Sequence, residues 1–156
     1  MTILPENIQL AEKGDELNSL LESFDFTVPK GHLDQALNAH TRSDWAAANA
    51  QMRPFIEGLF DLIAALLVGE TQPLPPTSQG KRELLAKLDP PFFLPSLNEW
   101  EIGDKGGFIQ GFWRRLHPQG SHPGLSDEED STFRLHLVVL VAWHYMKRLE
   151  KRLQNR

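Results

Sequence analysis

The segment from Arg114 to His122 is the part of the sequence best suited to chemistry. It reads Arg-Arg-Leu-His-Pro-Gln-Gly-Ser-His and holds two arginines, two histidines and a serine. A histidine can take the proton of an RNA 2′-hydroxyl or give one to the leaving oxygen, and an arginine can stabilise the charge that grows on the phosphate. Such a set can cleave RNA without a metal ion. The simpler interpretation is that Arg114 and Arg115 neutralise a helix C-terminus and that the Gly and Pro residues shape a turn.

A second polar group follows one predicted helix at four-residue intervals. Asn49, Arg53, Glu57 and Asp61 are each four residues apart. Successive members therefore rotate by about 40° and form one stripe on an otherwise apolar helix. We expect Arg53 and Glu57 to pair, because an isolated buried charge is very costly. The stripe either faces the turn and orients His122, or is a structural ion pair between two helices.

The sequence predicts no cofactor. His136 and His144 are eight residues apart, which is about 12 Å along a helix axis and too far for one shared metal ion. The chain has no Cys and no His-Glu-x-x-His spacing, so a thiolate nucleophile and the usual zinc sites are excluded. Gly-x-Gly-x-x-Gly and Walker patterns are absent as well.

The elements that position these residues are helices, because no alternating strand pattern of useful length occurs. Helices are expected over residues 5–23, 31–40, 44–68, 81–88, about 104–115 and 126–153, with an extended segment between 89 and 96. Pro54 predicts a kink or a break near Gln51 in the third helix. Ser126 and Glu129 form a capping box for the last helix, in which Asp130 and Arg134 can pair. The fold class is all-α: an antiparallel helical bundle with two long core helices and shorter flanking helices.

Length and composition indicate a single helical domain over residues 1–156. The chain is 40% hydrophobic and 24% charged, as in ordinary globular domains. Residues 1–30 are expected to form an N-terminal helix and arm. Residues 69–80, with three prolines and no periodicity, are expected to form a flexible loop.

The net charge of −5 combines two unlike parts. Residues 1–140 carry 11 basic and 20 acidic side chains, a net of −9, and residues 141–156 carry five basic and one acidic, a net of +4. The basic end either complements a helix dipole or contacts phosphate. No signal peptide and no apolar stretch of bilayer length is found. We therefore expect a cytoplasmic protein without a membrane partner.

The layout of these features resembles the HEPN superfamily. The shared features are a long helix with Arg53 and Glu57, a Pro-rich insertion, and Arg115 separated by six residues from His122 at a turn into a long terminal helix. The resemblance spans residues 32–153, and the run Ser121-His-Pro-Gly is similar to the Ser/Asn-His-Gly turns of abortive-infection-type members. HEPN domains are all-α bundles, and many are ribonucleases of toxin and antiviral defence systems. Their motif is an Arg followed a few residues later by a His, in a composite site between two protomers.

The resemblance implies a metal-independent endoribonuclease of a bacterial defence or toxin type that acts as a homodimer on RNA. Arg115 and His122 would be the catalytic pair, with Arg114 and Ser121 as helpers. An antitoxin or another protein would be a further partner.

Two alternatives to the ribonuclease stay open. Many HEPN-like domains are non-catalytic interaction or dimerisation modules, and Leu116 stands where catalytic members often carry a polar residue, which favours such a module. A small-ligand sensor would use Arg53 and Glu57 as its polar site.

Overall fold

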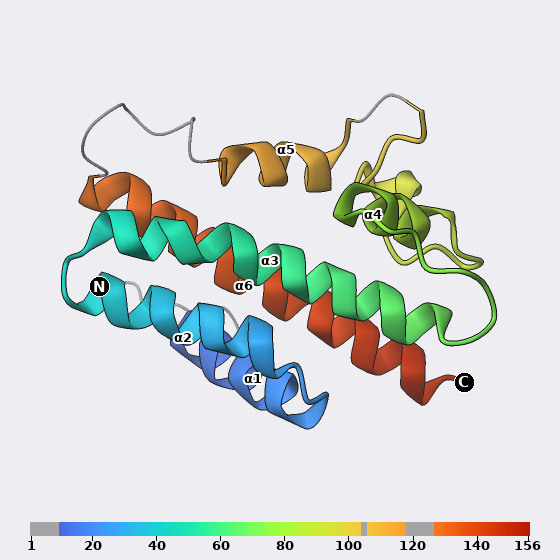
Figure 1. The fold of residues 1–156 in the computed structure, drawn as a ribbon, viewed down its shortest axis with the longest axis horizontal. Coiled ribbons are helices and arrows are strands. Elements are labelled where there is room, and N and C mark those ends of the chain that lie inside the picture. The colour runs from blue at the N-terminus through green and yellow to red at the C-terminus, as the bar shows by residue number, and fades with distance from the viewer. Residues whose placement is uncertain (1–9, 104–105, 118–126) are drawn as a thin grey trace, which may run out of the picture.

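The computed structural model describes residues 10–103, 106–117 and 127–156. All regular secondary structure in these residues is helical. Six α-helices are joined by loops and one 3-10 turn (Figure 1). They are α1 (Leu10–Ser23), α2 (Thr27–Thr41), α3 (Trp45–Val68), α4 (Ser78–Lys87), α5 (Phe108–Arg115) and α6 (Glu128–Gln154), with the turn η2 (Pro95–Leu97) before α5. The predicted all-α helical bundle is confirmed.

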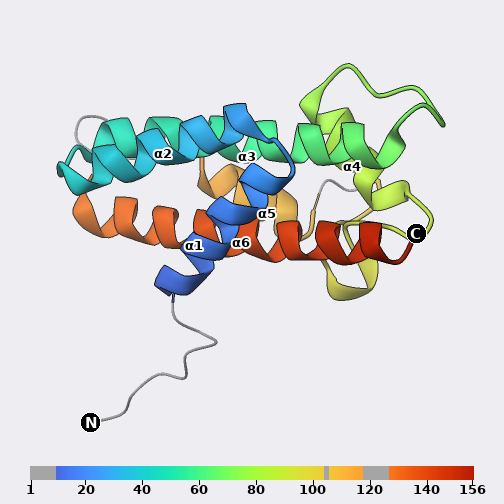
Figure 2. The ribbon, with the colours of Figure 1, turned by 90° about the horizontal axis from the view of Figure 1, so that it is seen from below.

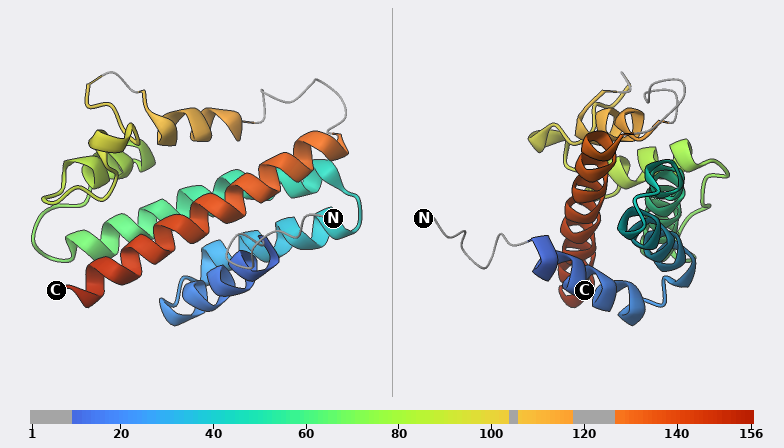
Figure 3. Two further views of the ribbon diagram at one scale, coloured as in Figure 1. Left: turned by 180° about the vertical axis from the view of Figure 1, so that it is seen from behind. Right: turned by 90° about the vertical axis from the view of Figure 1, so that its left-hand side faces the viewer.

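The helices lie in three layers. The long helices α3 and α6 form the middle layer, α1 and α2 cover one side of it, and α4 and α5 lie on the opposite side (Figures 1 and 3). Functional residues on α3 can therefore face either the α1–α2 side or the α4–α5 side.

The two long helices run in the same direction, and their predicted antiparallel arrangement is wrong (Figure 1). His40 at the end of α2 lies 3.1 Å from the Thr132 hydroxyl in the first turns of α6. At the other end of the bundle, Arg156 donates to the Leu67 carbonyl near the end of α3 at 3.3 Å. A short turn makes neighbouring helices antiparallel, as between α2 and α3 (Figure 2). The start of α6 instead lies at the end of the bundle where α3 begins, and α4 and α5 come between the two long helices in the sequence.

α3 is one uninterrupted helix, Trp45–Val68, within the range 44–68 expected from the sequence. The Asp44 side chain accepts from the Ala47 N–H at 3.2 Å. Gly69 ends the helix at φ +56°, a conformation that favours glycine. The helix passes through Pro54 without the expected break. Loss of one backbone hydrogen bond at this proline is offset by the burial of ten side chains along the helix.

Three other helix starts differ from the prediction. α2 begins at Thr27 and holds Pro29 in its first turn, where the missing N–H costs no intrahelical bond. α4 begins at Ser78 rather than residue 81, so residues 78–80 of the expected loop are helical. α5 begins at Phe108, after Gly107 at φ +93°.

The start of α6 is capped by Asp127, whose carboxylate accepts from the Asp130 N–H at 2.7 Å. The sequence predicted the cap one residue earlier, at Ser126, and this prediction is wrong; Ser126 itself lies outside the described residues. The first turn of α6 carries the acidic residues Glu128, Glu129 and Asp130, whose negative charges interact favourably with the positive N-terminal end of the helix dipole.

The extended segment after α4 is held by an aromatic cluster between α3 and α6. Phe92 and Phe93 are fully buried. The Phe93 ring lies 5.1 Å from Phe60 on α3 and 5.3 Å from Tyr145 on α6, both edge to face. This packing fixes the chain that leads to α5.

No α-helix in the described part of the chain is both long and apolar enough to cross a bilayer.

Candidate functional site

Arg115 is bound by the carboxylate of Asp130 in the first turn of α6, and the same carboxylate binds the buried Arg134. Arg115 is the last residue of α5, and its Nη2 donates to Asp130 Oδ1 at 2.6 Å. The other oxygen, Oδ2, accepts from Arg134 Nε at 2.7 Å, and Arg134 is 1% exposed. The Arg115 side chain is 41% exposed. Its guanidinium carbon lies 5.2 Å from the centre of the Phe133 ring.

Asp130 is charged under ordinary conditions because of these two cations. Burial raises the pKa of the Asp130 carboxyl, but the hydrogen bond from Arg115 and the charge of Arg134 together outweigh it and hold the pKa below its usual range. The predicted pairing of Asp130 with Arg134 is confirmed.

The other predicted catalytic residues are only partly described. Arg114 lies in the last turn of α5, where a cation complements the helix dipole. Ser121 and His122 lie outside the described residues, so the Arg115–His122 pair stays a prediction. Leu116, which follows Arg115, is 2% exposed and packs into the core. Its apolar character is therefore explained by packing.

The polar stripe of α3 faces α4 and α5, and its carboxylates bind the start of α4. The Ser78 hydroxyl, in the first residue of α4, lies 2.9 Å from both Glu57 Oε1 and Asp61 Oδ2. Lys81 Nζ lies 3.8 Å from the same Asp61 oxygen. These carboxylates complement the positive end of the α4 dipole.

The expected Arg53–Glu57 pair is not formed. Within the described ranges no ion pair joins these two side chains. The Arg53 guanidinium carbon instead lies 4.7 Å from the centre of the Trp113 ring on α5. The prediction is wrong because helical spacing places Arg53 and Glu57 on one face but does not show which neighbours compete for them.

A second arginine, Arg82, also lies over the Trp113 ring, and the sequence did not predict this contact. The guanidinium carbon of Arg82, on α4, lies 4.3 Å from the ring centre. Arg82 Nη2 donates to Gln79 Oε1 at 3.0 Å, and the same oxygen lies 3.3 Å from Gln110 Nε2. We call these five residues, Arg53, Gln79, Arg82, Gln110 and Trp113, the arginine–tryptophan cluster.

A sequence signal for Arg82 was available. Arg82 precedes the buried Leu85 by three residues, so both lie on the same face of α4. Arg82 is 3% exposed. Burial lowers the pKa of its guanidinium, and the charges of Glu57 and Asp61 offset only part of this effect.

An exposed apolar stripe runs along α6 beside Arg115. Phe133 is 51% exposed and Leu140 44% exposed, with the half-buried Leu137 between them. Leu97 and Phe108, 62% and 45% exposed, continue this surface. Together with Leu137 and Leu140 they line a cavity of about 450 Å³. We call these five residues, Leu97, Phe108, Phe133, Leu137 and Leu140, the α6 apolar face.

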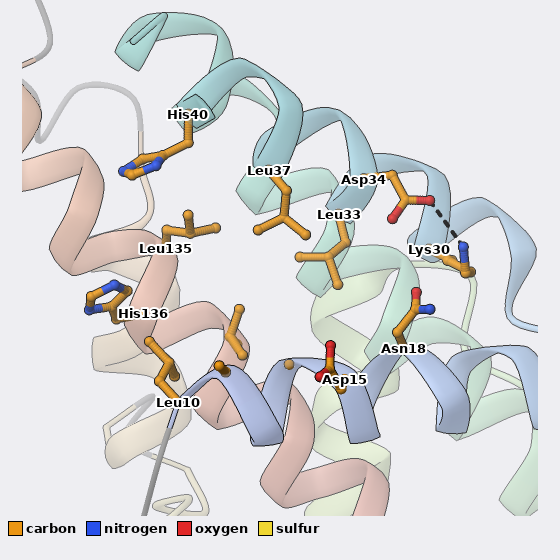
Figure 4. A pocket seen from close by; sticks show the side chains of 13 residues that line it. Leu10, Asp15, Asn18, Lys30, Leu33, Asp34, Leu37, His40, Leu135 and His136 are labelled. Atoms are coloured by element: carbon orange, nitrogen blue, oxygen red, sulfur yellow. Dashed lines mark hydrogen bonds and ion pairs between the residues drawn. The ribbon is translucent and has the colours of Figure 1, made fainter. Parts of the chain in front are cut away.

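A second cavity of about 600 Å³ lies between α1, α2 and α6, on the side away from Arg115. Leu10, Leu33 and Leu37 line it, and Asp15, Lys30 and Asp34 lie toward one end (Figure 4). Lys30 is paired with Asp34 at 3.1 Å and with Glu22 at 3.8 Å. The lysine is therefore committed to these carboxylates. Two histidines, His40 and His136, line the opposite end of the cavity, and His40 lies 3.1 Å from the Thr132 hydroxyl (Figure 4).

Several cations of the basic C-terminal end serve the fold. Arg148 donates to both carboxylate oxygens of Glu99, one of these bonds measuring 3.0 Å. Lys147 pairs with Glu16 at 2.9 Å. Burial raises the pKa of Glu99, but the hydrogen bond from Arg148 and other neighbours outweigh this and hold the pKa below its ordinary value. Of the two interpretations of the basic end, these contacts favour the structural one.

Among the described residues no group of three His, Cys, Asp or Glu side chains is placed to hold a metal ion.

Comparison with known proteins gives no match to a family model, a curated protein or a solved structure. Function must therefore be inferred from the residues themselves.

Proposed function

We propose that this chain is a metal-independent endoribonuclease of the HEPN type that acts as a homodimer. The observation that carries the proposal is the position of Arg115. It ends α5 directly before the segment that bears His122, and its partner Asp130 lies directly after that segment. A half-exposed guanidinium held by a carboxylate is pre-oriented, and a guanidinium binds phosphate oxygens with several parallel N–H donors.

The proposed reaction is transesterification within the RNA strand. His122 takes the proton from a 2′-hydroxyl, the 2′-oxygen forms a bond to phosphorus, and the bond from phosphorus to the 5′-oxygen breaks. Arg115 stabilises the negative charge that develops on the phosphate oxygens. The leaving 5′-oxygen receives a proton, and His122 of the partner subunit can supply it in a dimer. The products are a 2′,3′-cyclic phosphate and a 5′-hydroxyl.

The α6 apolar face supports the homodimer. A contiguous apolar patch of this kind on a soluble domain marks an interaction surface. Phe133 belongs to this face and also lies beneath the guanidinium of Arg115. A second copy packed on the face would therefore lie next to Arg115, as a composite site requires.

The test is a ribonuclease assay in the presence of a metal chelator, on wild type, Arg115→Ala and His122→Ala. Arg42, exposed at the end of α2, provides the matched control Arg42→Ala. We expect each site variant to lose activity by at least about a hundredfold, as for the removal of a group that transfers a proton or stabilises a transition state. The control should retain full activity. Equal activity in all four proteins would show that the cleavage is background and would sink the proposal.

The second candidate is a non-catalytic dimerisation module. It is favoured by the ion pair between Arg115 and Asp130, since this pair also explains Arg115 without any substrate. An inactive wild-type protein that still forms dimers through the α6 apolar face would support the module over the ribonuclease.

A further inference from the structure

We propose that the arginine–tryptophan cluster binds a phosphate oxyanion, at a site separate from Arg115. Arg82 Nε and Nη1 are buried and have no hydrogen-bond partner among the described residues, and the same holds for Arg53 Nε and Gln79 Nε2. Leaving a buried charged donor unsatisfied is costly. These donors lie around one tryptophan and come from two different helices, α3 and α4.

The two carboxylates nearest to the cluster, Glu57 and Asp61, each have an oxygen 2.9 Å from the Ser78 hydroxyl, and Asp61 Oδ2 also faces Lys81. The other oxygen of Asp61, Oδ1, is buried and has no hydrogen-bond partner among the described residues. Within the described residues neither carboxylate forms an ion pair with Arg82, although the charges of both act on its guanidinium. Arg53, Lys81 and Arg82 carry three positive charges against the two negative charges of these carboxylates, an excess of one. An anion would neutralise it and satisfy the unpartnered donors.

The arrangement of the donors favours phosphate over a carboxylate. Arg82 offers unpartnered donors at two of its nitrogens, Nε and Nη1, and Gln79 and Arg53 add one donor each from other residues. A planar carboxylate has two oxygens, whereas a tetrahedral phosphate distributes several acceptor oxygens over such donors. Arg53 and Trp113 are half-buried and lie at the accessible edge of the cluster. The phosphate can belong to an RNA strand or to a small molecule, and binding does not depend on ribonuclease activity.

The experiment is calorimetric titration of the full chain with inorganic phosphate, with acetate as the planar comparison. The variants are Arg82→Met and Arg53→Met, and Arg42→Met is the matched control, since Arg42 is exposed. We expect wild type and control to bind phosphate and not acetate, and Arg82→Met to weaken phosphate binding about tenfold to a hundredfold, as for loss of a charge-assisted hydrogen bond. If circular dichroism shows that Arg82→Met is unfolded, the phosphate affinity of Arg53→Met relative to wild type decides whether the cluster binds phosphate. Fluorescence of Trp113 should change on binding, and the change should vanish in Trp113→Phe.

Two further arms identify the source of the phosphate and separate this site from the proposed function. If an RNA backbone is the source, Arg82→Met should weaken binding of a non-cleavable 2′-O-methyl oligonucleotide by the same factor as inorganic phosphate. Unchanged oligonucleotide binding would identify a small phosphorylated molecule. Arg115→Ala should bind phosphate as wild type does, whatever its ribonuclease activity. The proposal is overturned if wild type does not bind millimolar phosphate, if acetate binds equally well, or if the folded Arg82→Met and Arg53→Met variants bind like wild type.

Discussion

Replacing Asp130 by Asn should destabilise the protein because it leaves the charge of Arg134 buried without its partner. Arg134 is 1% exposed, and its Nη2 already has no hydrogen-bond partner among the described residues. Breaking a buried ion pair costs about 3–5 kcal/mol. The Asp130 side chain is 26% exposed, and water can replace part of its interaction, so we expect a loss of about 2–3 kcal/mol. The more exposed pair with Arg115 adds less than about 1 kcal/mol.

The assay is urea unfolding at neutral pH, with two matched variants. Glu129→Gln removes an exposed carboxylate from the same first turn of α6, and its stability should change by less than about 0.5 kcal/mol. The double variant Asp130→Asn/Arg134→Met should recover part of the loss, because it removes the stranded charge. A loss below about 1 kcal/mol in Asp130→Asn, or no recovery in the double variant, would refute the reasoning.

The Asp130 carboxylate also makes the free energy of unfolding depend on pH in the acid range. Because the pKa of Asp130 is lowered in the folded state, the stabilisation is present above the unfolded pKa, about 3.9, and is lost as the pH falls through the folded pKa. Wild type should therefore lose more stability than Asp130→Asn on acidification below about pH 4. Parallel acid profiles for the two proteins would contradict this assignment.

Three further perturbations test other parts of the fold and the proposed dimer. Glu99→Gln removes the charge that binds Arg148 and should cost about 1.5–3 kcal/mol in urea unfolding. Phe93→Ala empties a fully buried position and should cost about 3–5 kcal/mol, whereas Leu97→Ala, at a 62% exposed position, should cost less than about 0.5 kcal/mol. Leu140→Glu should keep the helical content of wild type in circular dichroism but shift sedimentation from dimer to monomer; a variant that sediments like wild type would exclude the α6 apolar face as the dimer contact.

The features that the sequence predicted well depend on neighbours within one turn of helix. Asp44 and Gly69 delimit α3 through side-chain and backbone contacts a few residues away. The Asp130–Arg134 pair is likewise local. Their outcomes follow from spacing alone, because the helix itself brings the partners together.

Features that depend on tertiary neighbours were not predictable in this way. Helical periodicity shows that α3 and α6 are both buried but contains no information on their relative direction, which appears only in tertiary contacts such as His40–Thr132 and Arg156–Leu67. Glu99 and Arg148 lie far apart in the sequence, and the aromatic cluster around Phe93 brings them together. No local pattern marks that contact.

The polar stripe of α3 shows how a local error changes a functional interpretation. With α4 starting at residue 81, Glu57 would have had no serine to bind and Arg53 would have been its natural partner. Thr77 instead caps the helix by accepting from the Gly80 N–H at 3.0 Å, so α4 includes Ser78 and Gln79. Ser78 then lies within hydrogen-bond distance of one oxygen of Glu57 and one of Asp61, and Gln79 accepts from Arg82. The separation of cations from anions on which the proposed phosphate site depends thus follows from one added helical turn, and Thr77→Ala, which weakens the cap by about 1 kcal/mol, should weaken phosphate binding as well.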